Sequence, residues 1–104
     1  MNPKKQELPR LSSKEKVILE LLGTNGSMYG LQLVSQSQGK LKRGTVYVTL
    51  GRMEQKGLIV SEAEKFSDES GLVPRRMYRF TPFGLRVLEI WMQLEQKFAW
   101  EAGQ

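Results

Sequence analysis

The sequence of 104 residues contains no cysteine and no histidine. Disulfide frameworks, thiolate nucleophiles and the usual zinc sites are therefore excluded, and so is the most common general base. No apolar run approaches the roughly 20 residues that a membrane span needs, and the polar start does not lead into a signal-peptide core. We therefore expect a soluble, cytoplasmic protein that is not an enzyme and holds no metal or cofactor.

Positive charge is what the chain has in excess. The formal net charge is +5 at pH 7, which favours an anionic partner. Residues 1–57 contain ten Lys/Arg and four Asp/Glu, whereas residues 58–104 contain six and seven. The excess of cations therefore lies in the half of the chain that contains the helix described next.

A helix predicted over residues 43–56 has two distinct faces. Val46, Leu50 and Met53, at spacings of four and three, form an apolar stripe, and Gly57 is placed to end the helix in a left-handed cap. Another face carries hydroxyl groups and cations: Thr45, Thr49, Arg52 and Lys56. Cations suit phosphates, and Arg and Thr can read base edges. This helix therefore favours docking in a DNA groove; the alternative is a surface helix whose outer face is merely solvated.

Two shorter helices are predicted before it. The first begins at a capping box formed by Ser12 and Glu15 and buries Val17, Ile18, Leu21 and Leu22. The second covers roughly residues 28–37, begins at Ser27, and buries Met28, Leu31 and Val34, with Gly30 allowing close approach of a neighbour. Three helices with tight connections, the third of them basic, predict a helix-turn-helix.

After Gly57 the pattern becomes typical of strands. One extended segment runs from Leu58 to about Phe66 and a second from Arg75 to Phe80, which predicts a two-stranded hairpin. The fold class is therefore mainly α with a small β-hairpin. We predict a winged helix-turn-helix over residues 11–80, preceded by a flexible N-terminal arm at residues 1–10 that is either disordered or lies along DNA.

The last element, residues 81–104, is predicted to be a dimerisation helix that begins with Thr81 as N-cap and Pro82 in the first turn. It carries two apolar stripes: Val87, Trp91, Leu94 and Phe98 form the first, and Leu85, Leu88 and Met92 the second. A helix that packs only on its own domain needs one such face, and exposed aromatics favour association. The same helix of a second copy is the expected partner. The alternative is that the first stripe folds back onto the first helix.

Several segments carry residues in an order and spacing that is hard to obtain by accident. The most specific is Gly44-Thr45-Val46-Tyr47, with Leu50, Arg52-Met53-Glu54 and Gly57-Leu58-Ile59. The others are Ile18-Leu19-Glu20-Leu21-Leu22, Met28-Tyr29-Gly30-Leu31-Gln32-Leu33 and Arg75-Arg76-Met77-Tyr78-Arg79-Phe80-Thr81 with Gly84. Across about residues 15–100 the chain resembles the PadR family of bacterial transcriptional regulators, in its compact branch with a single helix after the wing.

The resemblance implies a dimeric, repressor-type protein that binds double-stranded DNA and is often relieved by a small molecule. Some members bind planar aromatic compounds between the paired C-terminal helices, where a tryptophan lines the site. Trp91 is the residue that could play this part, or it is a plain interface residue. Three departures stand out: Val48 replaces a common proline, Gly51 replaces a larger residue, and the wing tip carries Asp68 and Glu69, which would repel phosphate.

We therefore predict a two-fold dimer on a palindromic operator. Base contacts are assigned to Thr45, Thr49 and Arg52. Phosphate contacts are assigned to Lys40, Lys42, Arg43, Tyr47, Lys56, Arg75 and Arg76. The dimer interface is assigned to Val87, Trp91, Leu94 and Phe98.

The sequence also allows alternatives to these assignments. Arg52 could instead pair with Glu54 or another acid, and Tyr47 could be a packing residue. Gly51 costs about 1 kcal/mol of helix stability and serves either close packing or approach to DNA. A winged-helix module that docks an acidic protein partner would use the same basic helix.

Overall fold

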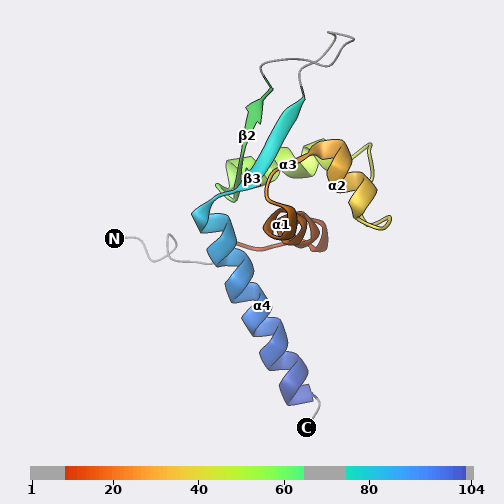
Figure 1. Ribbon diagram of the computed structural model, residues 1–104. Coiled ribbons are helices and arrows are strands. Elements are labelled where there is room, and N and C mark those ends of the chain that lie inside the picture. The colour runs from red at the N-terminus through yellow and green to blue at the C-terminus, as the bar shows by residue number, and fades with distance from the viewer. Residues whose placement is uncertain (1–8, 65–74, 103–104) are drawn as a thin grey trace.

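The computed structural model describes residues 9–64 and 75–102, with side chains described as far as Lys97. Its elements, in chain order, are α1 (Ser13–Asn25), β1 (Met28–Tyr29), α2 (Gly30–Gln36), α3 (Val46–Gln55), β2 (Ile59–Ala63), β3 (Arg76–Phe80) and α4 (Pro82–Ala102). In Figure 1, β2 and β3 project upward from α3, and α4 runs away from the other helices toward the C-terminus. The predicted fold class, a winged helix-turn-helix followed by a long helix, is confirmed.

The two helix ends that the sequence marks most clearly form as expected. The Glu15 N–H donates to Ser12 Oγ at 3.2 Å and the Ser12 N–H donates to Glu15 Oε1 at 2.9 Å, which completes the capping box of α1. Gly57 has φ +78°, and the Leu58 N–H donates to the Met53 carbonyl at 3.0 Å. The chain therefore leaves α3 through a left-handed glycine cap and enters β2 directly.

The prediction for the second helix is wrong at its start and in one core residue. Met28 and Tyr29 are extended and pair with β3, opposite Tyr78 and Met77. Within the described residues the sheet therefore has three strands, in the order β1-β3-β2. Because this pairing takes residues 28–29 out of the helix, α2 begins at Gly30 rather than at a Ser27 cap. Leu33 is fully buried, whereas Leu31 is 46% exposed.

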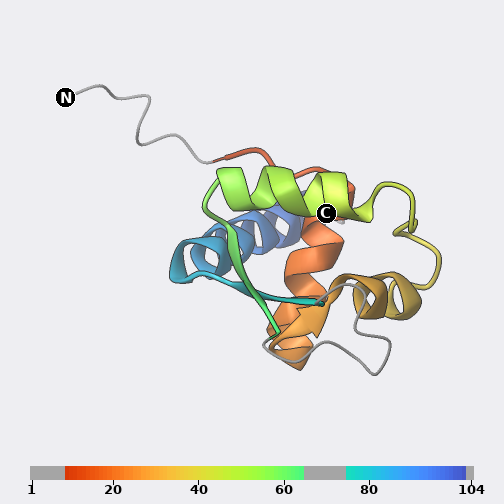
Figure 2. The same cartoon turned by 90° about the horizontal axis from the view of Figure 1, so that it is seen from above.

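One hydrophobic core joins α1, α2, α3, α4 and the sheet. It is formed by Ile18, Leu19, Leu22, Met28, Leu33, Leu41, Val46, Leu50, Met53, Leu58, Ile59, Tyr78, Val87 and Leu88. Seen from above, α3 runs along one edge of the molecule while α1 passes through the middle (Figure 2). The core therefore holds α3 by one face and leaves its other faces at the surface.

The first half of α4 belongs to this core. Thr81 accepts a hydrogen bond from the Gly84 N–H at 2.9 Å through its hydroxyl oxygen, as expected for the N-cap. Val87 is fully buried in its own chain and therefore has no surface left for a second copy, which corrects its assignment to the dimer interface. At this residue the predicted alternative, in which the stripe folds back within the chain, is what the structure shows.

Candidate nucleic-acid interface

The buried stripe of α3 decides which of its residues face outward. Val46, Leu50 and Met53 are almost completely buried, and successive helix residues are rotated by about 100°. Val48, Gly51 and Gln55 therefore form the outer face of α3, opposite the core, and all three are exposed. The predicted reading residues Thr45, Thr49 and Arg52, with Lys56, lie on one flank of the helix rather than on this outer face.

Arg52 has a free guanidinium group within the described part of the chain. Its side chain is exposed, and no described carboxylate lies within 4.0 Å of it. Glu54, the alternative partner, instead accepts a hydrogen bond from the Ser61 hydroxyl at 2.8 Å. Thr49 is half-buried and its hydroxyl donates to the Thr45 carbonyl at 3.3 Å, which leaves its oxygen able to accept. Arg52 is therefore available to a ligand.

Lys56 has a structural partner that the sequence did not reveal. Its ammonium group lies 2.8 and 3.0 Å from the two carboxylate oxygens of Glu15 and 3.1 Å from the Arg10 carbonyl. Glu15 is only 3% exposed, so one carboxylate both caps α1 and holds the end of α3. Phosphate contact by Lys56 remains a prediction.

Removing the Glu15 carboxylate tests this link. Glu15→Ala is expected to lower the free energy of unfolding by about 2–3 kcal/mol, because it removes the capping box and leaves the half-exposed Lys56 without its anion. Urea denaturation measures the change. Glu15→Gln keeps the capping acceptor but not the charge, so a stability equal to that of the unaltered chain would show that the ion pair contributes nothing.

The segment before α3 presents cations around one buried anchor. Leu41 is 2% exposed, and its N–H donates to Ser37 Oγ at 2.9 Å. Lys40 and Lys42 on either side of it are exposed, as is Arg43. The Lys42 carbonyl accepts from the Val46 N–H at 2.9 Å. The turn that starts α3 therefore also holds the backbone of Lys42 in place beside the helix.

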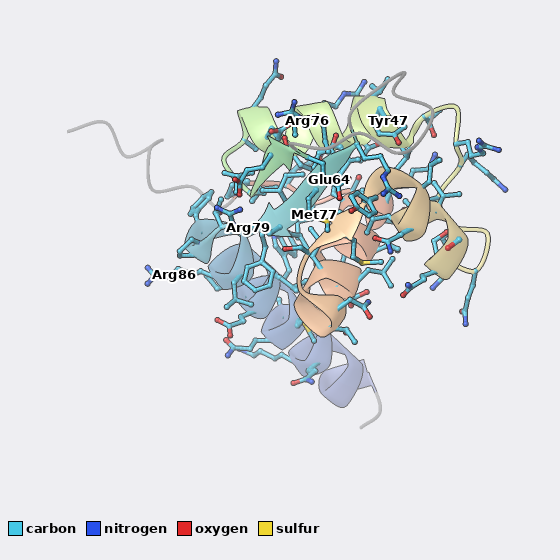
Figure 3. All side chains as sticks on the ribbon, turned by 45° about the horizontal axis from the view of Figure 1, so that its top comes forward. Tyr47, Glu64, Arg76, Met77, Arg79 and Arg86 are labelled. Atoms are coloured by element: carbon cyan, nitrogen blue, oxygen red, sulfur yellow. The ribbon has the colours of Figure 1, made fainter. Side chains whose placement is uncertain are left out.

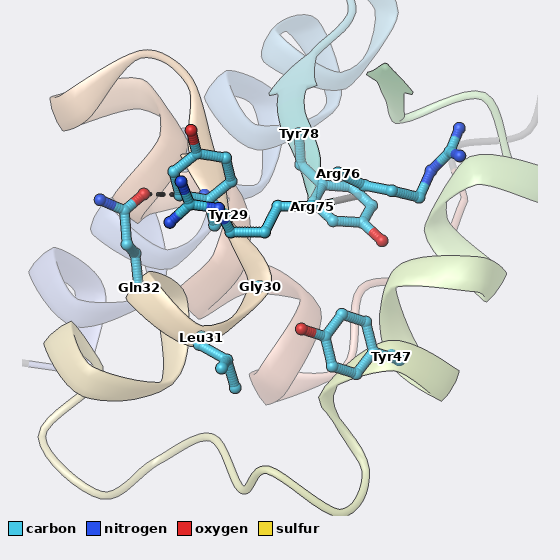
Figure 4. Close-up of a pocket in the computed structure, with 8 residues that line it drawn as sticks. All are labelled: Tyr29, Gly30, Leu31, Gln32, Tyr47, Arg75, Arg76 and Tyr78. Atoms are coloured by element: carbon cyan, nitrogen blue, oxygen red, sulfur yellow. Dashed lines mark hydrogen bonds between the residues drawn. The ribbon is translucent and has the colours of Figure 1, made fainter. Parts of the chain in front are cut away.

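The other flank of α3 faces the wing, which is formed by β2 and β3, across a hollow of about 470 Å³ (Figure 4). It is lined by Tyr29, Gly30, Leu31, Gln32, Tyr47, Arg75, Arg76 and Tyr78. A Cβ at Gly30 would lie 2.6 Å from the Tyr47 ring, which confirms that this glycine allows a neighbour to approach closely. Tyr47 is nevertheless 51% exposed, so its ring is both a packing group and a surface group.

The wing arginines are held by contacts within the wing and with β1. The Arg75 guanidinium lies 4.3 Å from the centroid of the Tyr29 ring, and its Nε lies 3.4 Å from a Glu64 carboxylate oxygen. The Tyr29 hydroxyl donates to Glu64, and this hydrogen bond raises the pKa of Tyr29 above its ordinary value. Arg76 Nε donates to Ser61 Oγ at 3.0 Å, and Figure 3 shows Arg76 on the side of α3 and Tyr47. Both arginines remain exposed at the surface.

The second half of α4 leaves an apolar face partly uncovered. Leu94 is 36% and Met92 39% exposed, and Ile90 is half-buried. Trp91 packs against the core cluster, and its indole N–H donates to the Pro9 carbonyl at 3.0 Å. The side chain of Phe98, also assigned to the dimer interface, lies outside the described residues, as do Asp68 and Glu69 of the wing tip.

Membrane-spanning helices and metal sites are absent from residues 9–64 and 75–102. No helix there is long and apolar enough to cross a membrane. No group of three or more acidic side chains there is arranged to hold a metal ion.

Comparisons with known proteins agree with this fold. The model of the family described as the transcriptional regulator PadR-like family matches residues 18–90. A PadR family transcription regulator from Clostridium difficile is 31% identical with a TM-score of 0.72, covering 88% of this chain and 94% of that one. Another, from Eggerthella lenta, is 28% identical with a TM-score of 0.70, covering 85% and 76%.

A more distant structure shares the fold alone. The PcaV transcriptional regulator from Streptomyces coelicolor, solved with its natural ligand, is 22% identical with a TM-score of 0.63, covering 76% of this chain and 51% of that one. Among curated proteins none matches the chain.

Proposed function

Since this chain belongs to the PadR-like family of transcriptional regulators, we propose that it acts as a repressor that binds a palindromic operator as a two-fold dimer. The observation that carries this proposal is the exposed, cation-bearing side of α3. Arg52 has no anionic partner among the described residues, and Lys42 and Arg43 stand exposed at the start of the helix. Backbone phosphates need such cations, and an α-helix fits the major groove.

Dimerisation is proposed through the second half of α4. The exposed apolar side chains there are Met92 and Leu94, which their own chain leaves 39% and 36% exposed. Pairing with the same helix of a second copy would cover them in an isologous contact. It would also present two copies of α3 to successive half-sites, about one DNA turn or roughly 34 Å apart. Residues 11–80 would then be the DNA-binding unit and residues 81–104 the dimerisation helix.

Selection of bound DNA from a random pool tests the function as a whole. Enrichment of one palindrome whose half-sites are about one turn apart is the expected result. If no sequence is enriched while an acidic protein partner binds tightly, the chain is instead a winged-helix interaction module. Repeating the selection with small aromatic compounds tests the effector that the resemblance implies. The candidate residue, Trp91, has its N–H bound to Pro9 in this structure.

Two substitutions separate base reading from phosphate binding. Arg52→Ala is expected to cost about 1–3 kcal/mol of binding free energy and to relax the preference at one base step. Lys42→Ala is expected to weaken binding to every sequence alike and to reduce the steepness of the salt dependence, because one fewer counterion per chain is released. Titration of the selected site and of a scrambled duplex at several salt concentrations measures both. A uniform loss in both variants would remove Arg52 from the base-reading residues.

A further inference from the structure

The outer face of α3 is apolar at its centre. Val48 is 57% exposed, more than any other large hydrophobic side chain in the described residues. Gly51 follows on the same face one turn later, and a Cβ added there would have no heavy atom within 4 Å. The i+3 neighbour of Val48 on the helix surface therefore carries no side chain, and the i+4 neighbour is Arg52. The exposed part of Val48 is open to a surface that α3 approaches.

Folding does not require either residue at these positions. Gly51 does not lie in the left-handed region, and the open space beside it excludes the close packing within the chain that was one explanation for it. Valine and glycine are both poor helix formers in a helix interior, and neither contacts the core. Residues that oppose local helix propensity without a gain in packing are typical of functional surfaces.

We propose that Val48 is a specificity-determining residue that contacts the C5-methyl group of a thymine in the major groove. This inference rests on the proposed DNA-binding function and names what the outer face of α3 reads. The thymine methyl is an apolar group on the major-groove edge, and an aliphatic side chain recognises it without hydrogen bonds. The exposed cations on α3 and before it, among them Arg52 and Arg43, would hold the helix against the phosphates. The missing side chain at Gly51 lets the helix approach the bases closely.

Replacing thymine with uracil in the selected operator tests the contact, because only the methyl group is lost. We expect one symmetric pair of thymines at which this change weakens binding by about fourfold per half-site, the effect of uncovering one methyl group. Val48→Ala removes both γ-methyl groups and should therefore reduce this difference between the thymine and uracil duplexes. Val60→Ala is the matched control, because it shortens an exposed valine on β2 and should keep the discrimination.

The possible outcomes distinguish a failure of this inference from a failure of the proposed DNA-binding function. If the selection enriches no DNA, the proposed function and the inference both fail. If a palindrome is enriched but no thymine responds to loss of its methyl group, or if Val48→Ala discriminates as well as the unaltered chain, the function stands and the inference is wrong. Val48→Ala should fold normally because alanine is the better helix former at an exposed site, and a thermal melt of the variant checks this.

Discussion

Leu94→Glu is expected to turn the dimer into a monomer and to lower affinity for the palindromic operator by about 10²- to 10⁴-fold. Leu94 is exposed on the second half of α4, so a carboxylate there would be buried without a partner when two copies pair. A monomer engages each half-site separately and loses the effective concentration that the second α3 gains from the first. Sedimentation equilibrium and operator titration measure the two effects.

Gln93→Glu is the matched control for this substitution. It adds the same charge to the same helix at an exposed position about 100° away, beside the polar residues Arg86 and Glu89. We expect it to leave both the dimer and the operator affinity nearly unchanged. A Leu94→Glu chain that stays dimeric would show that the subunits pair through another surface.

Gly84→Ala is expected to cost about 4 kcal/mol or more of folding free energy, which is a large part of the stability of a small domain. A Cβ at this position would lie 2.0 Å from the Leu58 carbonyl oxygen. That oxygen cannot move aside easily, because it accepts from the Thr81 N–H at 3.0 Å. The Thr81 hydroxyl, which donates to the neighbouring Gly57 carbonyl at 2.6 Å, holds the same segment in place. The start of α4 and the start of β2 therefore meet backbone to backbone, and overpacking here has no flexible side chain to absorb it.

Thermal or urea unfolding of the variants measures this effect, and Gly23→Ala serves as control. Gly23 lies within α1, and a Cβ there would meet no heavy atom within 4 Å. The same change at Gly23 is expected to stabilise the protein by about 1 kcal/mol, since alanine is the better helix former. A Gly84→Ala chain as stable as the unaltered protein would mean that α4 can shift away from Leu58 at little cost.

The fold could be predicted wherever residues close together in the sequence determine the backbone conformation. The capping box at Ser12 and Glu15 and the glycine cap at Gly57 depend on residues within a few positions of one another, and both formed as expected. The second helix could not be placed as well. Its start depends on Met28 and Tyr29 pairing with β3, whose residues lie about fifty positions along the chain, and no local signal announces this.

At the candidate nucleic-acid interface, too, local patterns were predictable and long-range contacts were not. Periodicity correctly separated the buried stripe of α3 from its polar side, but it did not show that Glu15 holds Lys56 or that Arg52 is free of Glu54. Those outcomes depend on which side chains the fold brings within a few ångströms of one another. The assignments of Arg52 and Lys42 to bases and phosphates remain predictions for DNA-binding measurements.

By itself the sequence determined the class of the protein: its residue spacings carry the winged helix-turn-helix, and its lack of cysteine and histidine removes the usual metal and nucleophile chemistry. Only the tertiary structure decided how the long last helix divides. Val87 and Leu88 are buried in their own chain, whereas Leu94 stays exposed. An apolar stripe indicates that a face of the helix will be covered, but only the packing of α4 against the rest of the chain shows which of its residues are covered.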